Sequence, residues 1–182
     1  SATAATSYEE VCDVVLAAAH HHQSAVVTLH AVHALVTAAG DPHLCQAVNG
    51  FDLVAADGQP VRWALNWLYR TRLRDRVYGP ELTLRLCQSA ASQGVPVYFY
   101  GSTAEVLARL VANLSEHYPR LVLAGCESPP FRTLTLAEED ETAERINRSG
   151  AGIVFIGLGA PKQDEFAHRM KGRIHAVQVC VG

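Results

Sequence analysis

The sequence predicts an α/β fold that is Rossmann-like, with a mostly parallel sheet and helices on both faces. Short apolar segments alternate with segments of helical periodicity along all 182 residues. Strands that alternate with helices of this length usually pair in parallel and are covered on both faces. The length is that of one ordinary domain, so we expect residues 1–182 to form a single domain.

The expected helices have recognisable start and stop signals. Ser7 suits an N-cap, and the acidic run Glu138–Glu141 lies at the positive end of a later helix. The expected helices run from Ser7 toward the histidines at 20–22, over 32–39, from the turn at 57–58 to 69, over 80–92, 104–117 and 137–149, and from Pro161 to near 170. The expected strands cover 25–28, 52–56, 96–100, 121–124, 153–156 and 174–182.

Composition excludes several classes of protein. Apolar residues make up 49% and charged residues 18%, as in globular proteins. The formal net charge of −3 lacks the excess of positive charge that is typical of nucleic-acid-binding proteins. The five cysteines contain no C-x-x-C pair, which indicates reduced thiols in a cytoplasmic protein. No apolar run approaches the roughly 18–20 residues of a membrane span, and no signal peptide is visible. A domain rarely ends on a core strand, so the last expected strand suggests a truncated chain.

The stretch from Gly157 to Glu165 is the most informative segment. Two glycines allow a sharp turn and close approach to a ligand, and Pro161 suits a first helical turn. Lys162 and Gln163 follow at a helix start, where free N–H groups favour an anion. The stretch is no dinucleotide fingerprint, because Lys162 stands where G-x-G-x-x-G needs its third glycine. A plain turn without a ligand remains the alternative.

Other candidates lie where strands are expected to end, because α/β sheets bind ligands there. These positions are Thr28, Asp57, Gly101, Gly125 and 157–163. Asp57 is either a turn former or a general base tuned by partial burial. The arginines at 72, 74 and 76 form either a solvated loop or a diphosphate site, since the guanidinium fork suits phosphate oxygens.

The histidines and tryptophans favour structural interpretations. Consecutive histidines at 20–22 cannot converge on one ion, and His30 and His33 lack a third ligand for zinc. The chain has no D-x-D pair, which argues against a metal–diphosphate arrangement. Trp63 and Trp67 stand four apart on an expected helix, which predicts core packing.

Six segments together resemble the WecG/TagA/CpsF glycosyltransferase family, also called glycosyltransferase family 26. They are V-V-T-L-H at 26–30, A-A-D-G-Q-P-V at 55–61, R-V-Y-G-P-E-L at 76–82, V-Y-F-Y-G-S at 97–102, 125–131, and G-L-G-A-P-K-Q at 157–163. Their order and spacing agree with the family over nearly the whole chain.

The resemblance implies an inverting, metal-independent enzyme without a cofactor. Such enzymes move N-acetylmannosamine or a related sugar from a UDP donor to a polyprenyl-diphosphate-linked acceptor at the inner membrane face. It implies catalytic roles for Asp57, as base, and for Thr28. It also implies substrate contacts by His30, Arg76, Gly101, Ser102, Phe131, Gly157, Gly159, Pro161, Lys162 and Gln163.

This chain departs from the family pattern at two positions. His30 replaces the asparagine of T-x-N, and Glu81 replaces the aspartate of G-x-D. The family also continues with a basic C-terminal appendage that docks on the membrane, and we expect residues 1–182 to lack it. Two alternatives stay open: a relative that binds UDP-sugar without turnover, and an NAD-type oxidoreductase that rests only on the glycine turn.

Overall fold

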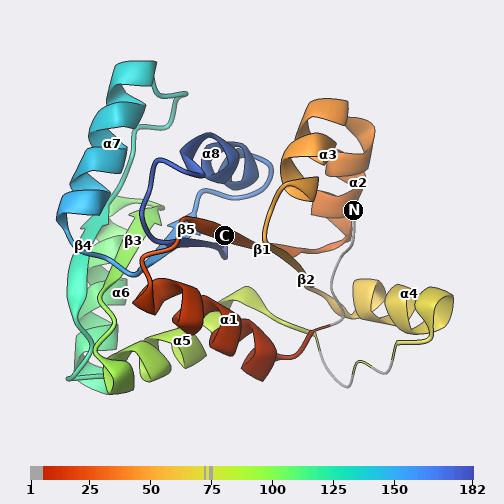
Figure 1. Ribbon diagram of the computed structural model, residues 1–182, viewed down its shortest axis with the longest axis horizontal. Helices are drawn as coiled ribbons and strands as arrows, with labels where there is room; N and C mark the ends of the chain where they lie inside the picture. The colour runs from red at the N-terminus through yellow and green to blue at the C-terminus, as the bar shows by residue number, and fades with distance from the viewer. Residues whose placement is uncertain (1–5, 72, 74–75) are drawn as a thin grey trace.

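The structure, a computed structural model, describes residues 6–71, 73 and 76–182. Its centre is a six-stranded sheet in which every pairing is parallel, with the strand order β2-β1-β6-β5-β3-β4. The predicted Rossmann-like α/β fold is therefore confirmed. Figure 1 shows this arrangement, with α4 extending beyond the sheet on the right.

The elements follow the expected alternation. The strands are β1 (Ala25–His30), β2 (Leu53–Ala56), β3 (Val97–Gly101), β4 (Leu123–Glu127), β5 (Ile153–Gly157) and β6 (Val177–Cys180). The helices are α1 (Tyr8–His20), α2 (Val32–Gly40), α3 (Pro42–Asn49), α4 (Gln59–Tyr69), α5 (Gly79–Gln93), α6 (Ala104–His117), α7 (Leu136–Arg148) and α8 (Lys162–Met170).

Several elements differ from the prediction. The short helix α3 was not predicted, although Asp41 caps it by accepting hydrogen bonds from the N–H groups of His43 and Leu44. Strand β6 is shorter than 174–182, because the N–H of Ile174 still bonds to the carbonyl of Met170 in the turn after α8. Strand β4 begins at Leu123 and extends to Glu127, later than expected at both ends.

Helices cover both faces of the sheet (Figure 1). One face packs against α1, α5 and α6 through a core that includes Val27, Phe99 and Phe155. The opposite face packs against α7 and α8 through a core that includes Tyr100 and Ile156. Neighbouring strand positions thus point to opposite cores, as the two-residue period of a strand requires. The carboxyl ends of the parallel strands remain as the edge where a ligand can approach.

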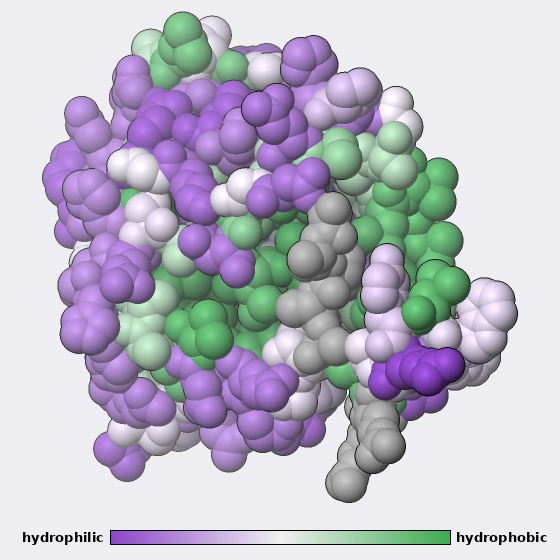
Figure 2. All heavy atoms as spheres, turned by 45° about the vertical axis from the view of Figure 1, so that its right-hand side comes forward, coloured by the Kyte–Doolittle hydropathy of each residue, from purple (hydrophilic) through white to green (hydrophobic). Residues whose placement is uncertain are grey.

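Helix α4 does not pack as predicted. Its side chains at 60, 63, 64, 67 and 68 are all exposed, at helical spacing, with Trp63 60% and Trp67 83% accessible. The prediction that these tryptophans belong to the core is therefore wrong. A helical apolar stripe shows that one face of the helix is apolar, but it does not show that another element covers that face. Figure 2 turns the side that carries α2 and α4 toward the reader, and hydrophobic atoms reach its surface.

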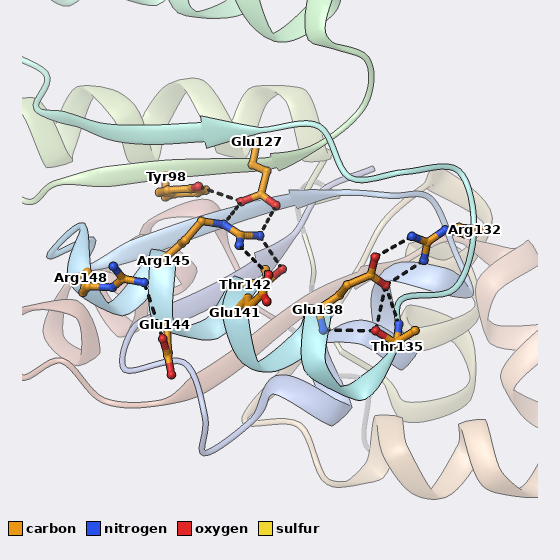
Figure 3. A network of polar contacts seen from close by, with 10 residues as sticks. All are labelled: Tyr98, Glu127, Arg132, Thr135, Glu138, Glu141, Thr142, Glu144, Arg145 and Arg148. Carbon is orange, nitrogen blue, oxygen red and sulfur yellow. Dashed lines mark hydrogen bonds and ion pairs between the residues drawn. The ribbon is translucent and has the colours of Figure 1, made fainter.

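A polar network joins the edge strand β4 to α7 (Figure 3). Arg145 donates to both carboxylate oxygens of Glu127, at 3.1 and 2.8 Å, and the hydroxyl of Tyr98 donates to the same carboxylate at 3.3 Å. Burial, followed by the negative charge of Glu127, raises the pKa of Tyr98 to about 12. The network fastens the outer strand β4 to α7. Among the described residues, no helix combines the length and the apolar character needed to cross a bilayer.

Candidate active site

The parallel register places most predicted site residues along one edge of the sheet. Gly101 pairs with Gly157, and His30 pairs with Ala56, directly before Asp57. The N–H of Asp57 donates to the carbonyl of His30 at 3.0 Å, which joins the ends of β1 and β2. Four separate predicted segments, 28–30, 57–58, 101–102 and 157–163, therefore belong to carboxyl ends of strands.

Glycines allow the backbone to pack closely at this edge. Gly101 has φ +127°, and a Cβ there would collide with the carbonyl oxygen of Gly157. A Cβ on Gly182 would lie 2.8 Å from the Cα of Gly157. By contrast, a Cβ on Gly157 or Gly159 would meet no described atom within 4 Å. The glycine turn is thus tight on its inner side and open on the other, which leaves room for a ligand beside its backbone.

The residues after this turn face in different directions. Pro161 is the N-cap of α8, just before the first helical residue, Lys162, which is exposed. Gln163 is only 1% accessible, and its side-chain oxygen accepts a hydrogen bond from the N–H of Gly182 at 3.1 Å. Lys162 is therefore available to an anion at the helix start, whereas Gln163 supports the turn from inside in this structure.

Three buried side chains, which we call the buried joint, connect α8 to β1. They are Thr28, His30 and Asp164, with accessibilities of 0%, 0% and 1%. The hydroxyl of Thr28 lies 2.7 Å from one oxygen of Asp164, and Nε2 of His30 lies 3.1 Å from the other. Nδ1 of His30 is buried and has no hydrogen-bond partner among the described residues. The two predicted residues of β1 are therefore organised by a third that the sequence did not single out.

The sequence alone did not mark Asp164 as a site residue. It directly follows Gln163 in the informative stretch, but an acidic residue in a first helical turn is already explained by the helix dipole. Its partners on β1 are 136 and 134 positions away, a separation that no local pattern spans. Burial of a carboxylate, rather than its occurrence, is the signal, and burial appears only in the folded chain.

Asp57 lies in a different environment at the end of β2. It is half-buried, and this burial raises the pKa of Asp57 above its usual value. The positive charge of Arg76 and a hydrogen bond from the backbone N–H of Gly58 act in the opposite direction. A carboxyl group with a raised pKa that still has access to solvent can accept a proton during a reaction.

Arg76 is held beside the end of β2 by the backbone. The N–H of Val77 donates to the carbonyl of Ala56 at 3.1 Å, and the guanidinium of Arg76 lies 4.8 Å from the ring centre of Tyr78. Stacking on an aromatic ring orients a guanidinium group. The predicted contributions of Arg72 and Arg74 fall on residues outside the described part of the chain.

The remaining predicted contacts lie near β3 and β4. Ser102 is exposed with φ +59°, and its carbonyl accepts a hydrogen bond from the hydroxyl of Ser128 at 2.7 Å. Phe131, on the loop between β4 and α7, is 84% accessible and so is not held by the core. Glu81 lies in the first turn of α5, where its carboxylate pairs with Arg85 at 2.7 Å.

The histidine-based metal sites considered from the sequence do not form in the described residues. His30 is buried in the joint, whereas His33 is exposed on α2. The histidines at 20–22 are exposed at the end of α1, and His20 bonds to Gln93. Within residues 6–71, 73 and 76–182, no group of three or more His, Cys, Asp or Glu side chains is placed to hold a metal ion.

Comparison with known families agrees with this geometry. A model of the glycosyl transferase WecG/TagA/CpsF family matches residues 2–182, essentially the whole chain. The matched region contains every strand of the sheet and every candidate residue at its carboxyl edge. The chain therefore belongs to the WecG/TagA/CpsF family and is a glycosyltransferase of cell-surface polysaccharide synthesis.

Proposed function

We propose that the protein transfers N-acetylmannosamine or a related sugar from a UDP donor to a polyprenyl-diphosphate-linked sugar, with inversion and without a metal ion. The observation that carries this proposal is the position of Asp57. Its half-buried carboxyl group lies at the end of β2, next to the positive charge of Arg76. The start of α8 and the open side of the glycine turn lie at the same edge of the sheet.

Asp57 acts as the general base in this proposal. Its carboxylate takes the proton from a hydroxyl of the acceptor sugar, and that oxygen forms the new bond to the anomeric carbon of the donor. The bond from the anomeric carbon to the diphosphate breaks at the same time, and UDP leaves with the electron pair. Attack from the side opposite the leaving group inverts the anomeric centre. Partial burial favours the step, since it raises the basicity of Asp57.

Positive groups of the protein stabilise the departing UDP. Arg76 supplies a guanidinium whose fork suits two phosphate oxygens, and Lys162 supplies an exposed ammonium group. The N-termini of α4 and α8 add backbone N–H groups and the positive ends of their dipoles. These preorganised charges do the work that Mg²⁺ does in other transferases.

The proposed acceptor implies that the protein works at a membrane surface. A polyprenyl chain is anchored in the bilayer, so the enzyme meets its acceptor as a peripheral protein on the cytoplasmic face. Several accessible residues follow Asp57 in the chain. They are the exposed stripe of α4, Tyr69 and Arg70. In this proposal no nucleic acid and no cofactor takes part.

A non-catalytic relative that holds UDP-sugar is the second candidate. His30 favours it, because this residue replaces the usual asparagine and is committed to Asp164 inside the fold. Both candidates share the donor site and differ only in turnover. Binding and transfer therefore have to be measured separately.

A thermal-shift screen tests the proposed donor first. Because a ligand that binds the native state stabilises it by mass action, saturating UDP and UDP-N-acetylmannosamine should raise the melting temperature, by the equivalent of about 2.7 kcal/mol at a hundredfold excess over Kd. NAD serves as the control and should leave the temperature unchanged. A shift with NAD alone would contradict the proposal and support an oxidoreductase.

Transfer to a polyprenyl-diphosphate acceptor is then measured with the full-length protein. We expect the same initial rate with excess EDTA and with added Mg²⁺. A rate that vanishes with EDTA and returns with one divalent metal would overturn the metal-independent mechanism. UDP binding without transfer under either condition would select the non-catalytic candidate.

A further inference from the structure

We propose that Asp164 is a positioning residue that fixes the imidazole of His30 and the hydroxyl of Thr28 in single orientations at the candidate site. Each oxygen of its carboxylate has one of these groups within hydrogen-bond distance, at 2.7 Å for Thr28 and 3.1 Å for His30. All three side chains are buried. The effect on UDP binding rests on the proposed function, whereas the effect on His30 does not.

The chemistry of the carboxylate determines which hydrogens the partners carry. A carboxylate oxygen only accepts hydrogen bonds, so the hydroxyl of Thr28 and Nε2 of His30 both donate. The lone pairs of the Thr28 hydroxyl then face away from Asp164. In a neutral ring with a hydrogen on Nε2, Nδ1 is an acceptor, and it has no partner among the described residues. A hydroxyl and a neutral imidazole can each donate and accept hydrogen bonds. By accepting from Thr28 and His30, Asp164 fixes the direction in which each of these two side chains of β1 can accept a hydrogen bond.

The same contact also links two strands of the site. β6 lies between β5 and β1, and α8 connects β5 to β6. Asp164 lies in the first turn of α8, where its N–H donates to the carbonyl of Pro161 at 3.0 Å. Its carboxylate therefore ties the turn after β5 to β1, beyond the intervening strand. A donor that contacts the glycine turn and β1 together would depend on this connection.

Burial argues that the joint serves more than stability. Removing a carboxylate from water costs several kcal/mol, and well-packed apolar residues often stabilise a fold as well as a buried ion pair does. A buried polar group that is fully paired fixes a single arrangement, whereas an apolar group of the same size does not impose one. A single arrangement matters at Asp164 because its carboxylate contacts two predicted site residues.

The substitution Asp164→Asn tests the proposal with almost no change in size. An amide offers one acceptor and one donor group where the carboxylate offers two acceptors, so one partner loses its acceptor. When the amide NH₂ faces His30, the ring must move its hydrogen to Nδ1. When the NH₂ faces Thr28, His30 keeps its Nε2 hydrogen and the Thr28 hydroxyl must accept instead of donate. Glu165→Gln is the matched control, because Glu165 is the next carboxylate in the same helical turn but is exposed.

Two measurements are made on wild type and both variants. Nitrogen-15 spectra of labelled histidine, with His30 assigned from His30→Gln, report the tautomer, and calorimetry reports the affinity for UDP. We expect a hydrogen on Nε2 of His30 in wild type and in Glu165→Gln. In Asp164→Asn we expect it to move to Nδ1 wherever the amide NH₂ faces His30. We expect UDP affinity to fall at least about tenfold in Asp164→Asn, because a buried hydrogen bond is lost, and less than about twofold in the exposed control.

A wild-type His30 without a hydrogen on Nε2 would overturn the proposal, and so would an Asp164→Asn variant in which neither the tautomer nor the UDP affinity changes. Unchanged UDP affinity beside a changed tautomer would reduce Asp164 to a purely structural role. A wild-type protein that does not bind UDP would refute the proposed donor instead, and the spectra alone would then decide the role of Asp164. If Asp164→Asn does not fold, Thr28→Val takes its place, and it should lower UDP affinity while His30 keeps its Nε2 hydrogen. Unchanged affinity in that variant would count against the proposal.

Discussion

The two halves of the candidate site differ in burial and in the groups that surround their carboxylates. In the buried joint, Asp164 is enclosed and both of its oxygens have a partner. At the end of β2, Asp57 is half-buried, its pKa is raised by that burial, and the charge of Arg76 opposes the rise. We propose opposite tasks for the two carboxylates. The enclosed one holds other groups still, and the accessible one can exchange a proton.

The surroundings of the two halves follow the same division. The buried joint lies between β1 and α8, where the core of one sheet face closes around it. Asp57 is followed by α4, whose apolar stripe faces outward. In the proposed reaction, the buried joint is the rigid wall of the site and the end of β2 is the wall that the acceptor can reach. The contrast teaches that burial, rather than residue type, separates positioning groups from reacting groups.

Replacing Asp57 by asparagine should have the largest effect. We expect the rate of transfer to fall about 10²–10⁴-fold, the usual cost of losing a general base. The affinity for UDP should stay nearly unchanged, because Asp57 faces the acceptor in the proposed reaction. Steady-state rates of transfer and calorimetric titration with UDP measure the two quantities. Full activity would remove Asp57 from the mechanism, and a tenfold loss of UDP affinity would reassign it to the donor site.

Replacing Arg76 by glutamine should weaken UDP binding by roughly 10–100-fold, because a hydrogen bond to a charged group contributes about 1.5–3 kcal/mol. Arg70→Gln is the matched control. Arg70 is exposed at the end of α4, so its loss should change UDP affinity less than about threefold. Titrations at two salt concentrations separate the cases. Equal, salt-dependent losses from both substitutions would indicate a diffuse electrostatic role in place of a specific contact.

Replacing the two carboxylates by asparagine should change the free energy of unfolding in opposite directions. Asp164→Asn should lower the free energy of unfolding by about 1–3 kcal/mol, because a buried donor loses its acceptor. Asp57→Asn should raise it at neutral pH by less than about 1 kcal/mol, since solvent screens a half-buried group. In a domain of this size, 1 kcal/mol corresponds to a melting-temperature shift of about 2–4 °C.

The pH dependence of Asp57→Asn has a defined direction. The pKa of Asp57 is raised in the folded state above its usual 3.8, so the folded state favours the protonated form. The resulting stabilisation is present below pH 3.8 and is lost as pH rises through the folded-state pKa. Wild type lacks this contribution at neutral pH, so the variant should be more stable there and should lose its advantage in acid. Thermal unfolding between pH 3 and pH 8 checks this, and a stability gain confined to acid would contradict it.

Sequence patterns predicted most of the fold. Alternating apolar and helical segments indicated a parallel sheet covered on both faces, and local chemistry marked the starts of α1 and α7. The eight-residue helix α3 was not predicted, although Asp41 and Pro42 provide its start signal. Short helices contain too few turns for a clear apolar period, so their signal is carried by the cap alone.

By itself, the sequence determined most of the elements, the turns at the carboxyl edge of the sheet and the family, because caps, glycine turns and apolar periods act over a few neighbouring residues. Only the tertiary structure decided which side chains are buried. It enclosed Asp164 beside Thr28 and His30, left Asp57 partly open, and left Trp63 and Trp67 exposed. Burial depends on which distant segment covers a face, and that information lies in contacts more than a hundred residues apart. The roles of the two carboxylates follow from those contacts.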